Sequence, residues 1–95
     1  MHRIEKTASG NLQLVIKDPI GSENFFVLAK NWVKQHDATF ISEAFNFDTQ
    51  LWEIKYQGEL FYLATDVWSG QFTLESKSEA GNAIIERLLL EENSK

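Results

Sequence analysis

The 95-residue chain contains no cysteine, which removes several kinds of chemistry at once. Disulfides, thiolate nucleophiles and zinc sites built on thiolates all require that side chain. Small secreted domains often depend on disulfides for stability, so their absence favours a reducing compartment. We therefore expect a cytoplasmic protein.

Histidine is also scarce, and the short motifs of catalysis and cofactor binding are missing. His2 stands near the start of the chain. His36 falls at the end of a predicted helix beside Asp37, where a cation suits the negative end of the helix dipole, so we interpret it as structural. The sequence has no G-x-S-x-G, no G-x-G-x-x-G and no EF-hand loop. We expect no catalytic residue, no metal site, no cofactor and no enzymatic activity.

Positive charge and long apolar runs are lacking as well. The net charge is −5 and no basic run is present, whereas proteins bind phosphate backbones through Lys and Arg. The apolar runs are only a few residues long, far short of a bilayer span, and the charged first residues do not resemble a signal peptide. We expect neither nucleic acid nor a membrane as a partner.

The chain does have ample material for a core. Hydrophobic residues make up 43% of it, including seven Phe, three Trp and two Tyr. One aromatic side chain can bury on the order of 150–250 Å². The length suits one domain, so we assign residues 1–95 to a single domain and expect residues 92–95 to fray.

Alternation and spacing of apolar residues predict the first three elements. Residues 4–7 and 12–17 read as strands about a turn at 9–11. A helix is expected from Ser22, as its N-cap, to about His36, with one apolar stripe. A second helix is expected after a capping box from Ser76 to Glu79.

Between the helices, two turn signals predict a three-stranded meander. If Gln57-Gly58 is a two-residue hairpin loop, Trp52 lies opposite Leu63 and Ile54 opposite Phe61. If Ser69-Gly70 is another, Val67 lies opposite Phe72 and Thr65 opposite Leu74. Both registers place the same apolar residues on one face, and a slip by one residue would scatter them. That face comprises Trp52, Ile54, Phe61, Leu63, Val67, Phe72 and Leu74.

A further strand is expected over residues 40–47, joined to the meander by a turn at Asp48-Thr49. Its predicted register sets Phe45 opposite Trp52 and Ile41 opposite Tyr56. The same register points Glu43 toward the core opposite Ile54, so either this carboxylate is buried or a bulge or edge position relieves it.

The element order ββ-α-ββββ-α predicts an α+β fold. We expect a two-layer sandwich, in which both helices pack on the apolar face of one antiparallel sheet and leave the other face open.

The open face is the leading candidate for function. Tyr and Trp anchor protein interfaces, and a solvated sheet face rarely presents them. We therefore expect a non-enzymatic protein-interaction or homodimerisation module that uses Leu60, Tyr62, Trp68, Glu53 and Lys55.

Two alternatives remain. One is a small-molecule-binding domain or minor enzyme, with a helix–sheet pocket near Glu43, Trp32 and Tyr56 and an elevated Glu43 pKa. The other is an acidic inhibitor or immunity-type protein that binds a basic partner.

Overall fold

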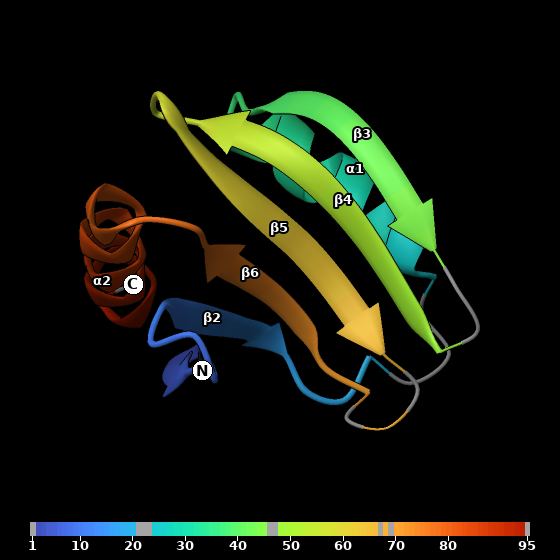
Figure 1. The fold of residues 1–95 in the computed structure, drawn as a ribbon, viewed down its shortest axis with the longest axis horizontal. Coiled ribbons are helices and arrows are strands. Elements are labelled where there is room, and N and C mark those ends of the chain that lie inside the picture. Colours follow the sequence, from blue (N-terminus) through green and yellow to red (C-terminus); the bar gives the residue numbers. More distant parts are fainter. Residues whose placement is uncertain (1, 21–23, 46–47, 67, 69, 95) are drawn as a thin grey trace.

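The computed structural model describes the whole chain except residues 1, 21–23, 46–47, 67, 69 and 95. It contains one six-stranded antiparallel sheet and two helices (Figure 1). In chain order the elements are β1 (Arg3–Lys6), β2 (Leu12–Lys17), α1 (Phe25–Gln35), β3 (Thr39–Phe45), β4 (Thr49–Tyr56), β5 (Glu59–Asp66), β6 (Phe72–Ser76) and α2 (Glu79–Asn93).

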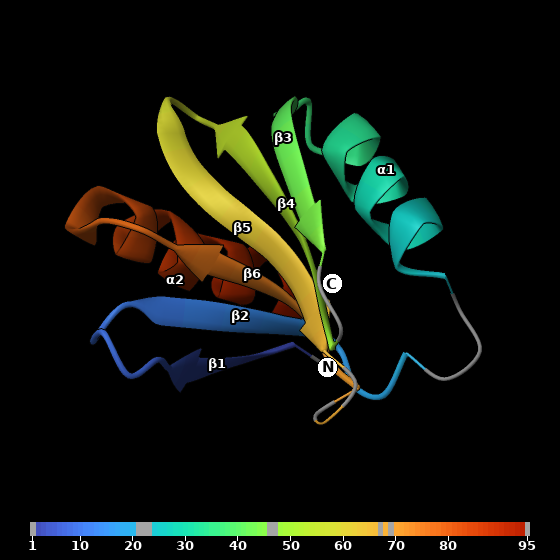
Figure 2. The same ribbon diagram turned by 45° about the vertical axis from the view of Figure 1, so that its right-hand side comes forward.

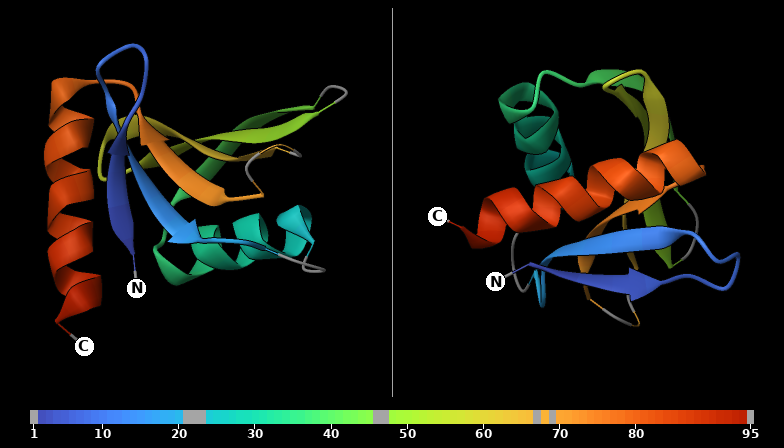
Figure 3. Two further views of the ribbon diagram at one scale, coloured as in Figure 1. Left: turned by 90° about the horizontal axis from the view of Figure 1, so that it is seen from below. Right: turned by 90° about the vertical axis from the view of Figure 1, so that its left-hand side faces the viewer.

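The predicted α+β class and element order are confirmed. The strands lie in the order β1-β2-β6-β5-β4-β3, so β1 and β3 form the two edges of the sheet. Figure 2 shows the strong twist of this sheet, with α1 running beside β3 at one end. The other helix, α2, lies beside β1 and β2 (Figure 3).

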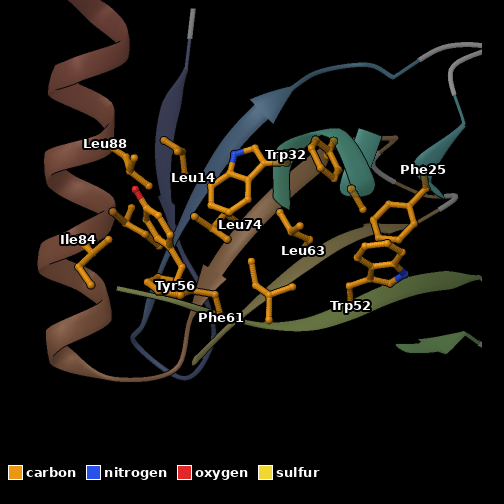
Figure 4. Packing of buried hydrophobic residues seen from close by; sticks show 14 residues of the cluster. Leu14, Phe25, Trp32, Trp52, Tyr56, Phe61, Leu63, Leu74, Ile84 and Leu88 are labelled. Carbon is orange, nitrogen blue, oxygen red and sulfur yellow. The ribbon is translucent and has the colours of Figure 1, made fainter. Parts of the chain in front are cut away.

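Both helices pack on one face of the sheet, as predicted, and a single core fills the space between the layers. Figure 4 shows Ile84 and Leu88 of α2 at one end of this core and Phe25 of α1 with Trp52 at the other. The buried cluster comprises Leu14, Phe25, Ala29, Trp32, Trp52, Ile54, Tyr56, Phe61, Leu63, Phe72, Leu74, Ile84, Ile85 and Leu88.

The hairpin of β4 and β5 has the predicted register. Trp52 lies opposite Leu63 and Ile54 opposite Phe61. The turn residues Gln57 and Gly58 have φ values of 53° and 81°, as a two-residue type I′ turn requires.

The second hairpin differs from its prediction by two residues. Leu74 lies opposite Leu63 and not opposite Thr65, because β5 ends at Asp66 and β6 begins only at Phe72. The Ser69-Gly70 loop is therefore longer than two residues, and the Gly70 amide donates to the Asp66 carbonyl at 3.0 Å. A shift by an even number preserves the face of each side chain, so Phe72 and Leu74 still reach the core. Val67 and Ser69 lie outside the described residues.

The predicted register of β3 is wrong. Phe45 lies opposite Gln50, and Glu43 lies opposite Trp52. The described strand ends at Phe45, and residues 46–47 of the predicted strand are not described. A β-bulge between Phe40 and Ser42 also absorbs one residue, Ile41.

Both predicted helix starts are corrected. Ser22 lies outside the described residues, and Asn24 caps α1 by accepting the Phe26 amide at 2.8 Å. Ser78, not Ser76, caps α2 and accepts the Gly81 amide at 3.0 Å. The capping-box prediction failed because β6 continues through Ser76, which is fully buried.

The last helix extends into the segment expected to fray, of which residues 92–94 are described. The helix α2 continues to Asn93, and Ser94 serves as its C-cap, with its amide donating to the Leu90 carbonyl at 3.1 Å.

Candidate functional site

The two edges of the sheet differ in length and charge. The strand β1 has four residues, of which Arg3, Glu5 and Lys6 are charged. The strand β3 has seven residues, all of them exposed, and its only charge is Glu43. Proteins usually protect edge strands from pairing with other chains by making them short or charged. The edge at β1 has both protections, whereas β3 is longer and has a single charge and a bulge.

Exposed apolar side chains gather along β3 and the adjoining side of α1. We call Phe26, Phe40, Ile41 and Phe45 the β3 edge patch; each is exposed, and Phe45 most of all, at 70%. The buried ring of Trp52 underlies it, with centroids 4.7 Å from Phe40 and 5.5 Å from Phe26. The Trp52 ring thus joins Phe26 of the helix to Phe40 of the strand.

A cavity of about 150 Å³ lies between the start of α1 and the end of β3. Phe25 and Phe26 form one wall, and Glu43, Phe45 and Trp52 line the other side. The Trp52 indole donates a hydrogen bond to the Glu43 carboxylate at 3.1 Å. We refer to this cavity as the α1–β3 groove, an apolar hollow with one carboxylate beside an unpaired strand edge.

The charges near the groove differ from those of the chain as a whole. The helix α1 contains Lys30 and Lys34 and no acidic residue, whereas α2 contains four Glu and one Arg. Within the described part of the chain, neither lysine of α1 forms an ion pair. Lys30 follows Phe26 by four residues, so both lie on the same side of the helix.

The chain belongs to the DUF3630 family. The model of this family, described as "Protein of unknown function (DUF3630)", matches residues 2–93. No curated protein and no solved structure matches the chain.

The structure does not gather the five predicted open-face residues into one surface. Trp68 lies in the β5–β6 loop and not on a strand, because that loop is longer than predicted. It is 84% exposed, and its indole donates to Asp48 at 3.0 Å. Leu60 and Lys55 lie opposite each other at the far end of β5, beside the turn at Gly58.

The middle of the open face makes contacts within the chain. The Lys77 ammonium lies 4.4 Å from the centre of the Tyr62 ring and 3.1 Å from a Glu53 carboxylate oxygen. Hydrogen bonding to Tyr62, and next to Glu53, holds the pKa of Lys77 above its ordinary value. Val15, on the same face, is only 2% exposed. Tyr62 and Glu53 thus already have partners within the chain.

The predicted pocket of Glu43, Trp32 and Tyr56 is divided between two places. The Trp32 and Tyr56 rings lie 5.3 Å apart, and His36 stacks on Trp32 at 4.0 Å. Glu43 lines the α1–β3 groove together with Trp52. Figure 4 shows Trp52 on the α1 side of the core and Tyr56 on the α2 side. Glu43 is exposed and not buried, because β3 is an edge strand.

A second cavity, of about 230 Å³, lies near Trp32 and His36 between the last turns of the helices and β2. The His36 Nδ1 lies 2.9 Å from the Trp32 carbonyl and must donate there, since a carbonyl only accepts. This hydrogen bond and the stacking on Trp32 hold the His36 ring against the last turn of α1, where His36 is the C-cap. Among the described residues, no group of three or more His, Asp or Glu side chains could hold a metal ion.

Neither of the described helices is long and apolar enough to cross a bilayer.

Proposed function

We propose that this protein is a non-enzymatic protein-interaction module that recruits an extended segment of a partner to the β3 edge. The observation behind the proposal is the contrast between the short, charged edge at β1 and the long, nearly uncharged edge at β3. An exposed edge offers backbone donors and acceptors to an added strand, and adjacent pockets select its side chains.

The α1–β3 groove supports the proposal because it supplies such a pocket. A strand added beside β3 would bring alternate side chains to the core face, where Phe26 and Phe45 border the cavity. These rings are exposed in the single chain, so covering them removes apolar surface from water at roughly 25 cal/mol per Å².

The open face supports an interaction less well than this edge. Tyr62 and Glu53 are engaged by Lys77, and Trp68 lies apart from Leu60 at the other end of β5. In the β3 edge patch, by comparison, Phe26 and Phe40 both pack on Trp52, and Phe26 lines the α1–β3 groove together with Phe45.

Photo-crosslinking in cells tests this choice of surface. A benzoylphenylalanine residue replaces Phe45 in one variant and Leu60 in another, which compares the edge with the open face. We expect protein adducts at position 45 and few at position 60, and we expect Ala44→Lys to suppress those at position 45. Adducts of equal yield at both positions, or none at position 45, would contradict the proposal.

A further inference from the structure

The second cavity, of about 230 Å³ beside Trp32 and His36, has the features of a small-molecule pocket. We call it the Trp32 pocket. Its walls come from three elements, with Leu14 and Ile16 on β2, Trp32 and His36 at the end of α1, and Leu88 on α2. Apolar walls with a few polar groups at fixed positions are the usual lining of a ligand site.

The indole N–H of Trp32 is the polar group that points to a ligand. Trp32 is only 6% exposed, and a buried indole N–H usually finds an acceptor. The other two tryptophans each donate to a carboxylate. The Trp32 N–H, in contrast, donates to no atom in the described part of the chain.

This N–H reaches the pocket. Among the described residues, no side-chain nitrogen or oxygen is both fully buried and unpaired, so the Trp32 nitrogen must lie against accessible space. The Trp32 ring lines the pocket, and Figure 4 shows its nitrogen at the edge of the ring that is turned away from Leu63 and Leu74. The pocket therefore offers a ligand one hydrogen-bond donor in a largely apolar wall.

His36 supplies an acceptor beside this donor. Its ring stacks on that of Trp32 with centroids 4.0 Å apart, and its Nδ1 donates to the Trp32 carbonyl. In the neutral imidazole, Nε2 is then an acceptor, and no described residue donates to it. A donor and an acceptor on two stacked rings match the carbonyl and the N–H of an amide.

Charge and volume narrow the class of ligand further. Glu92 lines the pocket, and none of the described lining residues is Lys or Arg, so an anionic ligand would meet a carboxylate without a fixed cation. A dry apolar cavity of about 150 Å³ is large enough to bind benzene. The Trp32 pocket is larger, so it has room for one ring with a polar substituent.

We propose that the Trp32 pocket binds a small, uncharged aromatic amide or lactam. The ring of the ligand lies against Leu14 and Leu88, its carbonyl accepts the Trp32 indole N–H, and its own N–H donates to His36 Nε2. This site is separate from the α1–β3 groove, so this inference and the proposed function stand or fall independently.

An NMR titration with benzamide tests the site. The three tryptophans of the chain give three indole N–H signals, which Trp→Phe variants assign. We expect the Trp32 signal to shift and saturate with a Kd on the order of 1 mM, as suits a ligand of this size. The signals of Trp52 and Trp68 should stay in place. An unmoved Trp32 signal, or a larger shift of the Trp52 signal in the α1–β3 groove, would overturn the proposal.

Two related probes test the proposed class of ligand. Toluene keeps the ring without the amide, and benzoate replaces the amide by an anion of similar size. We expect both to bind more weakly than benzamide, by about 2- to 10-fold for each hydrogen bond lost. Toluene of equal affinity would exclude a role for the hydrogen bonds, and tighter binding of benzoate would show a site for anions. Either result overturns the proposed class.

Two variants test the pocket, with benzamide binding followed through the signals of the ligand. Trp32→Phe keeps a ring and removes the donor, so the affinity should fall by about 2- to 10-fold. Trp68→Phe is the matched control, because it makes the same change at an exposed tryptophan of the β5–β6 loop and should leave the affinity unchanged.

Leu88→Phe fills the pocket from the α2 side, and it should abolish binding although every polar group of the pocket stays. Urea unfolding checks that each variant is folded. If Trp32→Phe does not fold, Leu88→Phe decides the outcome alone. Unchanged affinity in Leu88→Phe, or an equal loss in Trp32→Phe and Trp68→Phe, would overturn the assignment of the site.

Discussion

Asn82, near the start of α2, accepts two hydrogen bonds through one side-chain oxygen. The Leu12 amide donates to its Oδ1 at 2.9 Å, from a residue 70 positions earlier in the chain. The Ser76 hydroxyl donates to the same atom, and Ser76 is fully buried. One side chain thus connects α2 to the start of β2 and the end of β6.

Asn82→Ala should lower the free energy of unfolding by about 2–3 kcal/mol. A buried donor left without its acceptor costs about 1–3 kcal/mol. We expect the cost of the unpaired donor to lie in the middle of this range for the fully buried Ser76 hydroxyl and near its lower end for the half-buried Leu12 amide. The better helix propensity of Ala offsets about 0.5 kcal/mol of the sum.

Urea unfolding followed by tryptophan fluorescence measures this loss. With a denaturant slope of about 1.2 kcal/mol per molar, the midpoint should fall by about 2 M. The matched control is Asn82→Asp, which keeps an acceptor oxygen in place and adds a negative charge near the helix N-terminus, where the dipole favours it. We expect this variant to stay within about 1 kcal/mol of the unmodified chain.

A double-mutant cycle with Ser76→Ala isolates the shared bond. Removing the hydroxyl alone should cost about 1 kcal/mol, since Asn82 still accepts the Leu12 amide. The double variant should lose less than the sum of the two single losses, because no buried hydroxyl is then left unpaired. The reasoning is refuted if Asn82→Ala costs under about 0.5 kcal/mol, or if Asn82→Asp is as damaging as Asn82→Ala.

Three further predictions concern single residues. Burial raises the pKa of Glu75, so its contribution to stability falls as pH rises from its ordinary value, near 4.5, through the raised one. Glu75→Gln should therefore raise the free energy of unfolding by a fraction of a kcal/mol near neutral pH and by less below about pH 4. A shift of the urea midpoint that is equal at the two pH values would contradict this. Gly58 has a φ of 81° with open space around it, so Gly58→Ala should cost about 1–2 kcal/mol from backbone strain alone; an unchanged midpoint would exclude that strain. Hydrogen bonds from Arg3, and next from Gln71, lower the pKa of Asp18, whose contribution to stability is present above its ordinary pKa and lost as pH falls through the lowered one. Arg3→Gln should raise this pKa toward its ordinary value in an NMR titration, and an unmoved value would exclude Arg3 as the main cause.

The sequence predicted the part of the sheet whose contacts are local. The turn at Gln57-Gly58 leaves two residues between its strands, so alternation on both sides determines the pairing of Trp52 with Leu63. The β5–β6 loop has no such constraint, and alternation alone cannot distinguish registers that differ by two residues. The face of Leu74 was therefore predictable, and its opposite residue was not.

Features that depend on distant segments could not be predicted in this way. The bulge at Ile41 places Glu43 opposite Trp52, although the sequence around it shows no Gly or Pro to signal an irregular strand. Asn82 likewise looks like an ordinary polar residue of an amphipathic helix, because its donors lie in β2 and β6.

The candidate site depends on topology more than on any motif. Both Arg3–Lys6 and Thr39–Phe45 read as strands from the sequence, but a strand's charge matters for association only if that strand lies at an edge. The pairing of β2 with β6 closes the interior of the sheet and leaves β1 and β3 at its ends. Once that order is known, the three charges of β1 read as protection, and the exposed aromatic side chains of β3 read as a surface for another strand. The interaction module remains a proposal, and its proposed location changes from the open face around Tyr62 to the edge around Phe45.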